Sequence, residues 1–280
     1  MNEKFIILTP EERELLPTVL LRRNKFRNVI IKCITLRKSA FSNAIFIQGR
    51  AGTGKTTLIT EFLETLKEDR VIEEYSRVCG HVTQSSLYEF LKTDYDMNIV
   101  HVLDDVDCLY DGGCLELLKS ALDTKNSNKD NRHVYYSSRG VRNAYKYSGF
   151  LILITNDKLE NPSPHLQAVL DRVHMLEMEL EPGDFFIFNN HLVEKYLNEN
   201  PDSIDEKILQ KVADFYNNTV REWFNNDVFS QCNLNFSIRM IKKFIDLIVW
   251  FDDSWKDYSI EYKKLTNKNN EIKSKNIQIS

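Results

Sequence analysis

The sequence predicts an α/β protein in which a parallel sheet is flanked by helices and followed by a small all-α unit. Short apolar runs alternate with helical patterns between residues 44 and 181, which is typical of a parallel sheet covered on both faces. After Pro182 the pattern becomes helical, and aromatic residues recur on it at helical spacing. A chain of 280 residues is long enough for one large domain or two modest ones.

We expect four segments along the chain. A helical segment over residues 1–43 leads into an α/β core over residues 44–181, and residues 182–262 form the all-α unit. Residues 263–280 are polar and rich in Asn and Lys, a composition that buries little apolar surface. We therefore expect that last segment to be disordered.

Composition excludes some classes of protein. Lys and Arg total 37 against 41 Asp and Glu, a net charge of -4, which argues against a generally basic nucleic-acid coat but leaves room for a local basic patch. The first ten residues carry no basic stretch followed by an apolar core, and no apolar run approaches ~18 residues, so we expect a cytoplasmic protein. The cysteines form no CxxC pair and are expected to be reduced and structural: Cys33, Cys79, Cys108, Cys114 and Cys232.

The N-terminal segment is expected to be helical and basic. Residues 11–40 show helical periodicity, and Pro17 is expected to separate a short first helix from a longer second one. Basic residues lie between the apolar positions: Arg22, Arg23, Lys25, Arg27, Lys32, Arg37 and Lys38. Such a run either contacts nucleic acid or forms a solvated helix face, and the solvated face is the commoner explanation.

A glycine-bearing loop joins the first apolar run to the next helix. Residues 44–47 form an expected buried strand, and the sequence GRAGTGKT after it fits the pattern of a glycine, four residues, then glycine, lysine and threonine. Glycines let backbone N–H groups turn inward around phosphates, and the helix N-terminus adds partial positive charge. The residues expected to contact a nucleotide are Gly49, Arg50, Ala51, Gly52, Thr53, Gly54, Lys55, Thr56 and Thr57.

Two side chains of this loop have specific expected roles. Lys55 should reach the β- and γ-phosphates of ATP, and Thr56 should bind Mg²⁺ through its hydroxyl group. The alternative is an ordinary glycine turn between a strand and a helix, which leaves the lysine and the threonine unexplained.

Strands and helices then follow in alternation. Strands are expected at residues 76–82, 98–105, 132–138 and 149–157, and helices at residues 55–66, 84–93 and 114–123. The strand at 132–138 is expected to be exposed, and those at 98–105 and 149–157 to be buried. After Pro182, helices are expected at residues 184–198, 203–226 and 237–251.

Polar side chains end two of the buried strands. Asp104 and Asp105 end one, and the carboxyl ends of parallel strands meet where a phosphate loop lies. We expect Asp104 to hold Mg²⁺ directly or through water, and Asp105 to orient and deprotonate the attacking water. Asn156 ends the other strand, where its amide can bind that water or the γ-phosphate. Solvated strand ends and a turn preference of Asn are the alternatives.

These motifs, in this order, resemble those of the AAA+ ATPases over roughly residues 10 to 255. The Walker A motif is GRAGTGKT, the Walker B motif is IVHVLDD, and Asn156 in LILITND resembles sensor 1. The stretch HLQAVLDRVHMLEMEL is similar to the segment that carries the arginine finger, with Arg172 at the matching position. NFSIRMIKKFIDL is similar to the sensor 2 helix of the lid, with Arg239 at the matching position.

The resemblance implies a P-loop core, a helical lid, and a homo-oligomeric ring or spiral with ATP at the subunit interfaces. Arg172 would then reach the γ-phosphate bound by a neighbouring subunit, and Arg239 would contact phosphates from the lid of its own subunit. The alternatives are a surface arginine after a helix for Arg172 and a lid salt bridge for Arg239.

One position departs from the family pattern. The family usually has glutamate after the Walker B aspartate, and this chain has Asp105, which is shorter by one methylene. Either hydrolysis is slow, because ~1 Å of misplacement is costly, or the backbone adjusts. Asp107 is a less favoured substitute.

The partner of the ATPase is predicted from a second basic region. Residues 132–147 alternate cations with aromatics. Together with the preceding stretches GHVTQSSLYEFLKT and LLKSALDT, they resemble ATPases carried by bacteriophages and other mobile elements. The cations expected to contact DNA are Arg132, Arg139, Arg142 and Lys146, and the alternatives are a subunit interface or tyrosines that cover a sheet edge. We expect an ATPase that acts on DNA or a DNA-bound partner, as a helicase loader or clamp loader does. A protein remodeller and a nucleotide-gated scaffold with little hydrolysis stay open.

Overall fold

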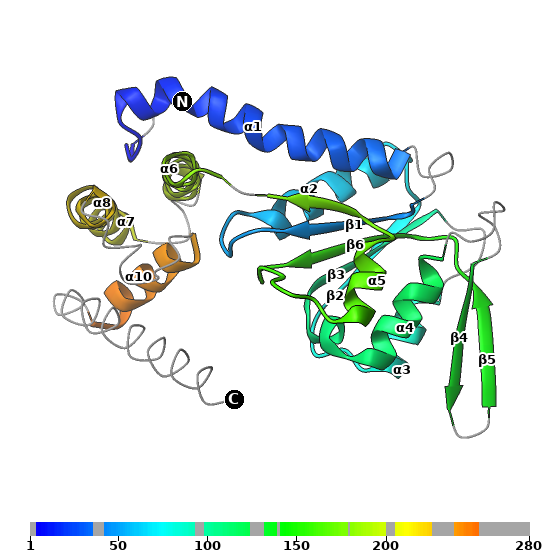
Figure 1. Cartoon of the computed structure of the whole chain (residues 1–280). Helices are drawn as coiled ribbons and strands as arrows, with labels where there is room; N and C mark the ends of the chain where they lie inside the picture. The colour runs from blue at the N-terminus through cyan, green and yellow to red at the C-terminus, as the bar shows by residue number, and fades with distance from the viewer. Residues whose placement is uncertain are drawn as a thin grey trace. The chain divides into compact units, whose positions relative to one another are not determined.

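The computed structural model describes residues 4–35, 42–92, 98–123, 132–138, 141–178, 180–199, 205–225 and 238–251. The chain divides into two compact units (Figure 1). The α/β unit comprises Arg22–Glu179, and the helical unit joins Met1–Leu21 to Leu180–Ser280. The predicted polar tail at residues 263–280 lies outside the described residues.

The α/β unit contains a five-stranded sheet in the order β2-β3-β6-β1-β7, and every pairing in it is parallel. Its strands are β1 (Ala44–Gln48), β2 (Glu74–Gly80), β3 (Ile99–Val106), β6 (Phe150–Thr155) and β7 (His174–Glu177). The central strand β6 is buried at every position, because its apolar residues meet helices on both sides of the sheet. A parallel sheet flanked by helices confirms the predicted α/β fold class.

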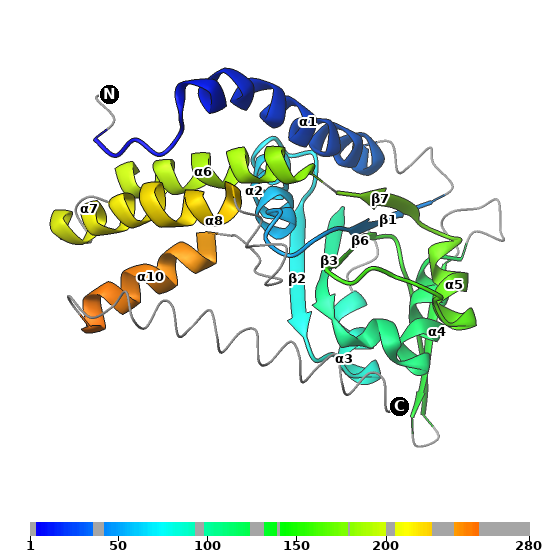
Figure 2. The same ribbon diagram turned by 60° about the vertical axis from the view of Figure 1, so that its left-hand side comes forward.

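Helices cover both faces of the sheet (Figure 2). Alternate residues of each strand point to opposite faces, so Phe46 and Leu153 join one apolar cluster while Ile45 and Ile152 join the other. The second cluster includes residues of α1 and α2, and the first includes residues of α3, α4 and α5. These helices are α1 (Pro10–Thr35), α2 (Lys55–Glu68), α3 (Gln84–Leu91), α4 (Gly112–Ala121) and α5 (Pro164–Leu170).

Helix α1 runs without a break through Pro17, so the prediction of two separate helices was wrong. Proline removes one N–H donor and disfavours the helix interior. Two buried residues nevertheless hold α1 against apolar neighbours: Val19 in its first half and Ile30 in its second half. The division between the two units falls inside this helix, between Leu21 and Arg22.

A separate antiparallel hairpin belongs to the α/β unit. Its strands are β4 (His133–Ser138), as predicted, and β5 (Val141–Lys146). On one face Tyr136 and Tyr145 pack against Tyr88 of α3, with ring centroids 5.1 and 4.9 Å from that of Tyr88. The other face is exposed at Tyr135, whose exposed fraction is 66%.

The helical unit has its own aromatic core. Its helices are α6 (Pro182–Glu199), α7 (Glu206–Phe215), α8 (Arg221–Asn225) and α10 (Ile238–Phe251), with a π-helical turn at Tyr216–Val220. Phe215 and Phe244 meet edge to face, with centroids 5.0 Å apart. The helical stretches predicted after Pro182 are therefore helical in the described residues.

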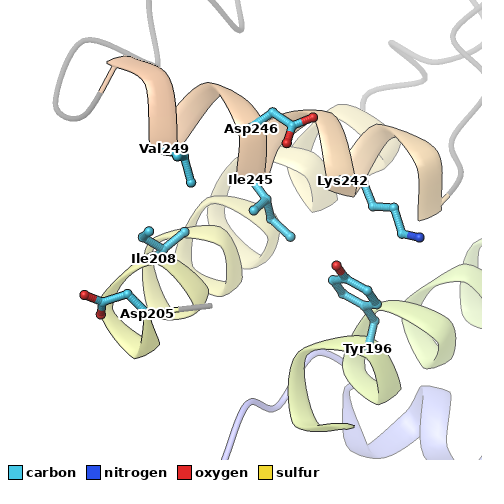
Figure 3. Close-up of a pocket in the computed structure, with 7 residues that line it drawn as sticks. All are labelled: Tyr196, Asp205, Ile208, Lys242, Ile245, Asp246 and Val249. Atoms are coloured by element: carbon cyan, nitrogen blue, oxygen red, sulfur yellow. The ribbon is translucent and has the colours of Figure 1, made fainter. Parts of the chain in front are cut away.

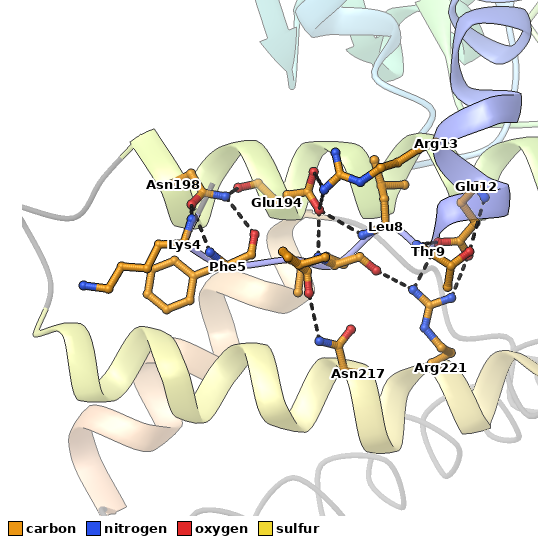
Figure 4. Close-up of polar contacts among 12 residues, drawn as sticks. Lys4, Phe5, Leu8, Thr9, Glu12, Arg13, Glu194, Asn198, Asn217 and Arg221 are labelled. Atoms are coloured by element: carbon orange, nitrogen blue, oxygen red, sulfur yellow. Dashed lines mark hydrogen bonds and ion pairs between the residues drawn. The ribbon is translucent and has the colours of Figure 1, made fainter. Parts of the chain in front are cut away.

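The segment Lys4–Thr9 lies against α6 in the helical unit (Figure 4). Asn198 accepts from the backbone N–H of Phe5 at 3.1 Å and donates to its carbonyl oxygen at 2.9 Å. Glu194 accepts from the N–H of Ile7 at 2.7 Å. Side chains thus supply the partners that buried backbone groups of this segment require.

Two ion pairs join the first turn of α1 to the same unit. Arg13 pairs with Glu194 at 3.0 Å, and Arg221 pairs with Glu12 at 2.7 Å. Glu194 is buried, and Arg13 provides the charge that a buried carboxylate needs. The residues before Pro10 therefore belong structurally to the helical unit, as the division of the chain indicates.

Candidate nucleotide-binding site

The loop between β1 and α2 requires glycine at three positions. A Cβ atom at Gly49 would lie 2.3 Å from the carbonyl oxygen of Met178, which is backbone and cannot move aside easily. Gly52 and Gly54 have φ values of 84° and 75°, in the left-handed region that favours glycine. The loop backbone therefore adopts a path that side chains at these positions would block or strain.

Helix α2 begins directly after this path. Its N-cap residue, Gly54, has no side chain to accept from the first N–H groups, and the first turn contains no acidic residue. The first N–H groups of a helix have no partner within the helix, and its dipole places partial positive charge at that end. This combination suits an anion such as a phosphate group.

Lys55 points back into the loop. Its residue is only 4% exposed, and Nζ donates to the carbonyl oxygens of Gly49 at 2.6 Å and Arg50 at 2.9 Å. Nζ also donates to Oδ1 of Asn156 at 2.7 Å. A buried ammonium group requires such acceptors, and phosphate oxygens are stronger acceptors because they are charged.

Thr56 and Asp104 meet at the edge of the sheet. Thr56 Oγ1 lies 3.1 and 3.0 Å from the two carboxylate oxygens of Asp104, which is buried near the end of β3. A hydroxyl group beside a carboxylate is a set of hard oxygen donors, and Mg²⁺ commonly takes one or two carboxylates and completes its shell with waters and phosphates. The two residues therefore fit a magnesium ion that also contacts a nucleotide. Within the described residues, no three His, Cys, Asp or Glu side chains are grouped to hold a metal.

Arg77 joins this pair, and the sequence reasoning missed it. Its Nε lies 3.1 Å from Oδ2 of Asp104. The one available signal was that Arg77 is a charged residue within the predicted strand SRVCGHV. Long-range register decides that such a residue reaches the site, and register is not visible in one sequence.

Asp105 sits at a bulge where the pairing of β2 with β3 shifts. Cys79 pairs with Asp104 and Gly80 with Val106, which leaves Asp105 without a register partner. Its φ is 48°, in the left-handed region, which is uncommon for a non-glycine residue. The bulge turns the side chain away from the regular strand direction.

The side chain of Asp105 is held by Asn156. The backbone N–H of Asn156 donates to Oδ1 at 2.9 Å, and its side-chain amide donates to Oδ2. Since Asn156 also accepts from Lys55, the three predicted residues form one connected chain of hydrogen bonds. Partial burial raises the pKa of the Asp105 carboxyl group, as do the carboxylates of Asp104 and Asp157, while the Asn156 N–H lowers it. The raised pKa makes this carboxylate a stronger base.

The carboxylate of Asp107 contacts His81 and Val82 instead of Asn156. One oxygen pairs with His81 Nδ1, and the other accepts from the N–H of Val82 at 2.9 Å. The hydrogen bond from His81 lowers the pKa of Asp107, and the same bond raises the pKa of His81. Asp107 is therefore the weaker base of the two aspartates considered.

Arg172 lies away from the loop of its own chain. It precedes β7, whereas the loop follows β1, and these neighbouring strands run parallel, so Arg172 and the loop lie at opposite ends of the strands. Its guanidinium group donates to the carbonyl oxygen of Ala168, and its own carbonyl accepts from Ser42 Oγ at 2.9 Å. Arg239 is in the first turn of α10, and its side chain lies outside the described residues.

The cations predicted to contact DNA have different surroundings. Arg132 is only 8% exposed, and its Nε donates to the carbonyl oxygen of Asp123 at 3.3 Å, so the expectation that it faces DNA was wrong. Lys146 pairs in register with His133, and Arg142 with Ser137. The side chain of Arg142 and all of Arg139 lie outside the described residues.

The helical unit contains a groove of its own, of about 530 Å³ (Figure 3). It lies between α6, α7 and α10, and apolar and charged side chains share its lining: Tyr196, Asp205, Ile208, Lys242, Ile245, Asp246 and Val249. Lys242 Nζ stands 5.4 Å from the ring centroid of Tyr196. None of the predicted nucleotide-site residues whose side chains are described lines this groove.

In the part of the chain that the structure describes, no helix is long and apolar enough to cross a membrane. The four described cysteines, Cys33, Cys79, Cys108 and Cys114, are free thiols.

Comparisons with known proteins give one similar sequence and a distant structural likeness. No protein-family model matches the chain. Over 151 residues the chain is 30% identical to the "Uncharacterized 36.7 kDa protein in nrdC-mobD intergenic region" of Enterobacteria phage T4. The match covers 50% of this chain and 46% of that protein. The matched region spans less than half of the phage protein. The match to a phage protein agrees with the predicted likeness to phage proteins.

Among solved structures, domain III of the replication initiation protein DnaA from Thermotoga maritima is similar at a TM-score of 0.39 and 13% identity. The match covers 89% of this chain and 94% of the DnaA domain. The α/β assignment rests on the parallel sheet of this chain rather than on that likeness.

Proposed function

We propose that this chain is an AAA+ ATPase that binds ATP·Mg²⁺ through the loop Gly49–Thr56 and hydrolyses ATP at the interfaces of an oligomer. One observation carries the proposal: two sets of contacts meet at a single edge of the sheet. Thr56 lies against Asp104, and Lys55 connects through Asn156 to Asp105. An ordinary glycine turn would not require any of these contacts.

In this proposal each residue acts on a different part of the reaction. Lys55 exchanges the loop carbonyls for phosphate oxygens, and Thr56 and Asp104 hold Mg²⁺, which supplies positive charge to the phosphates. Asp105 accepts the proton of the attacking water. Asn156 fixes the Asp105 carboxylate through two N–H groups, which keeps the base in one orientation.

Arg172 and Arg239 act on the nucleotide from outside the loop: Arg172 from a neighbouring subunit and Arg239 from the lid of the same subunit. Arg172 lies at the strand ends opposite those that its own loop follows, which fits a role at the site of a neighbouring subunit. There it supplies positive charge as phosphoryl transfer spreads negative charge over the oxygens. The segment over residues 182–262 acts as the lid, and Arg239 at the start of α10 contacts the phosphates of its own subunit from there. The assembly is a ring or spiral of identical subunits.

The proposed partner is DNA or a DNA-bound protein, and the hairpin β4–β5 supports it. Cross-strand partners share a face, so the exposed face of the hairpin carries His133 and Tyr135 beside Lys146 and Ala144. Aromatic rings stack on unpaired bases, and cations neutralise backbone phosphates. An exposed tyrosine beside a lysine on an antiparallel ribbon fits that chemistry.

The test of the ATPase proposal is binding and turnover of ATP with Lys55→Ala as the blank. Wild-type protein should bind ATP more tightly with Mg²⁺ than with EDTA and should release phosphate, whereas Lys55→Ala should do neither. Equal turnover by the two proteins would overturn the assignment of the site. Nucleotide binding without turnover would favour a nucleotide-gated scaffold.

The test of the DNA proposal adds single- and double-stranded DNA at low salt. Tyr135→Ala should weaken binding of single-stranded DNA by about tenfold, since stacking contributes ~1–3 kcal/mol per base. Trp250→Ala is a matched control, because Trp250 is 69% exposed and lies in the helical unit. If DNA changes neither the ATP turnover nor the ATP affinity of any variant, the proposed partner becomes a protein.

A further inference from the structure

Arg77 lies next to the candidate metal site but comes from a strand with no assigned role. It is on β2, the strand at one edge of the sheet, and β2 pairs only with β3 in the described sheet. Arg77 pairs in register with Val102, two residues before Asp104. Register partners in a sheet share a face, and so do residues two apart, so Arg77, Val102 and Asp104 lie on the same face.

That face is the one covered by α2. Val102 belongs to the apolar cluster that includes Leu58 and Phe62 of α2, and Thr56 is in the first turn of the same helix. Asp104 therefore receives contacts from two elements: Thr56 Oγ1 at 3.0 Å from α2 and Arg77 Nε at 3.1 Å from β2.

The burial of the two partners differs. The side chain of Asp104 is 5% exposed and that of Arg77 is 40% exposed. A buried carboxylate requires both hydrogen bonds and a compensating charge, and a hydroxyl group such as that of Thr56 supplies only the first. Arg77 supplies the charge from the solvent side, and the planar guanidinium group also fixes the direction of the contact.

We propose that Arg77 is a positioning residue that holds the Asp104 carboxylate against Thr56 and thereby sets the affinity of the nucleotide site for Mg²⁺. This inference rests on the proposed function, since it takes Thr56 and Asp104 as the magnesium donors. A residue that orients a metal ligand commonly changes metal affinity or activity by about 10- to 100-fold when it is replaced.

Two effects of Arg77 oppose one another, which makes the direction of the change informative. As a cation, Arg77 repels Mg²⁺, so its removal by charge alone would tighten magnesium binding. As an orienting group, it keeps the carboxylate in the productive rotamer, so its removal loosens magnesium binding. Orientation outweighs repulsion, because the Asp104 carboxylate is buried and its contact with Thr56 is uncharged.

The experiment measures ATP binding by calorimetry in EDTA and across a Mg²⁺ titration, without relying on turnover. The variants are Arg77→Gln, which removes the charge, and Arg77→Lys, which keeps the charge without the planar group. Cys79→Ser is the matched control, because Cys79 is exposed on the same strand and pairs in register with Asp104. Thermal melting of each variant checks folding.

The quantity compared is the Mg²⁺ half-point, the Mg²⁺ concentration that gives half of the Mg²⁺-dependent gain in ATP binding. We expect it to be about tenfold higher for Arg77→Gln, to shift by an intermediate amount for Arg77→Lys, and not to shift for Cys79→Ser. Affinity in EDTA should stay within about twofold, as the loop that contacts the phosphates is unchanged. An unchanged or lower half-point for Arg77→Gln would overturn the inference. If Arg77→Gln fails to fold, a wild-type half-point in a folded Arg77→Lys would overturn it instead, and an intermediate one would support it. If wild-type protein itself shows no Mg²⁺-dependent ATP binding, the proposed function has failed, and this inference fails with it.

Discussion

Asn156 holds Asp105 by two N–H groups, with the backbone N–H 2.9 Å from Oδ1 and the side-chain amide on Oδ2. The contact forms because a bulge at the end of β3 gives Asp105 a φ of 48° and removes it from the regular pairing with β2. The sequence left two possibilities for an aspartate at this position, slow hydrolysis or an adjusted backbone. The bulge favours the second, since the shorter side chain meets its neighbour from a backbone that departs from the strand.

The first prediction concerns the length of that side chain. Asp105→Glu should lower ATP turnover by about 10- to 100-fold, because an extra methylene displaces the carboxylate from Asn156 by ~1 Å. ATP affinity should change little. Steady-state kinetics and a nucleotide-binding measurement on the wild-type protein and Asp105→Glu separate the two effects. A faster Asp105→Glu enzyme would show that the bulge does not compensate for the shorter residue.

The second prediction concerns the close approach at Gly49. Gly49→Ala should lower the free energy of unfolding by about 1–3 kcal/mol, because its Cβ would press on the backbone carbonyl oxygen of Met178. Gly112→Ala is the matched control, since nothing lies within 4 Å of a Cβ at that position. Urea unfolding of both variants measures the difference. Equal stability of the two would contradict the close packing between the loop and the end of β7.

The third prediction concerns action across a subunit interface. Arg172→Ala should leave ATP binding near the wild-type value and lower turnover by about 10³-fold, as loss of an arginine finger does. Mixing Arg172→Ala chains with Lys55→Ala chains should restore part of the turnover, because some interfaces then combine an intact loop with an intact arginine. Turnover is measured over a range of mixing ratios. No recovery at any ratio, with equal loss of binding, would place Arg172 in a role within its own chain.

The fourth prediction concerns a buried histidine of β3. Burial lowers the pKa of His101 to about 4 from its ordinary 6.5, and its Nδ1 lies 3.1 Å from the hydroxyl oxygen of Tyr147. Between these two values the unfolded chain binds the proton and the folded chain does not, so stability is greatest above pH 6.5 and falls as the pH falls toward 4. The slope from this group reaches about 1.4 kcal/mol per pH unit.

His101→Phe should remove that part of the slope. Urea unfolding of both proteins from pH 7 to pH 5 measures the difference between them, which cancels the contribution of carboxylates common to the two. Parallel pH profiles would show that His101 titrates alike in the folded and unfolded chain.

The sequence by itself determined many of the elements and the chemical types at their ends, although α5, β5 and β7 were not predicted. Local patterns suffice for this: the apolar run 150–155 forms a buried strand in any context that covers it, and GRAGTGKT fixes a loop because glycine conformations are local. The helices after Pro182 and the strand at 133–138 were predicted on the same grounds. Pro17 was misjudged because contacts far along the chain outweigh a local preference.

The tertiary structure alone decided which residues meet. Arg77 reaches Asp104 through the register of two strands, and Asp105 turns toward Asn156 through a bulge, neither of which has a local signature in the sequence. Arg132 has the sequence context of a surface cation, yet it is buried and donates to the carbonyl oxygen of Asp123. Local sequence restricts backbone dihedral angles, whereas burial and strand pairing depend on residues brought together from far along the chain. The contacts within the site are therefore determined by the tertiary structure.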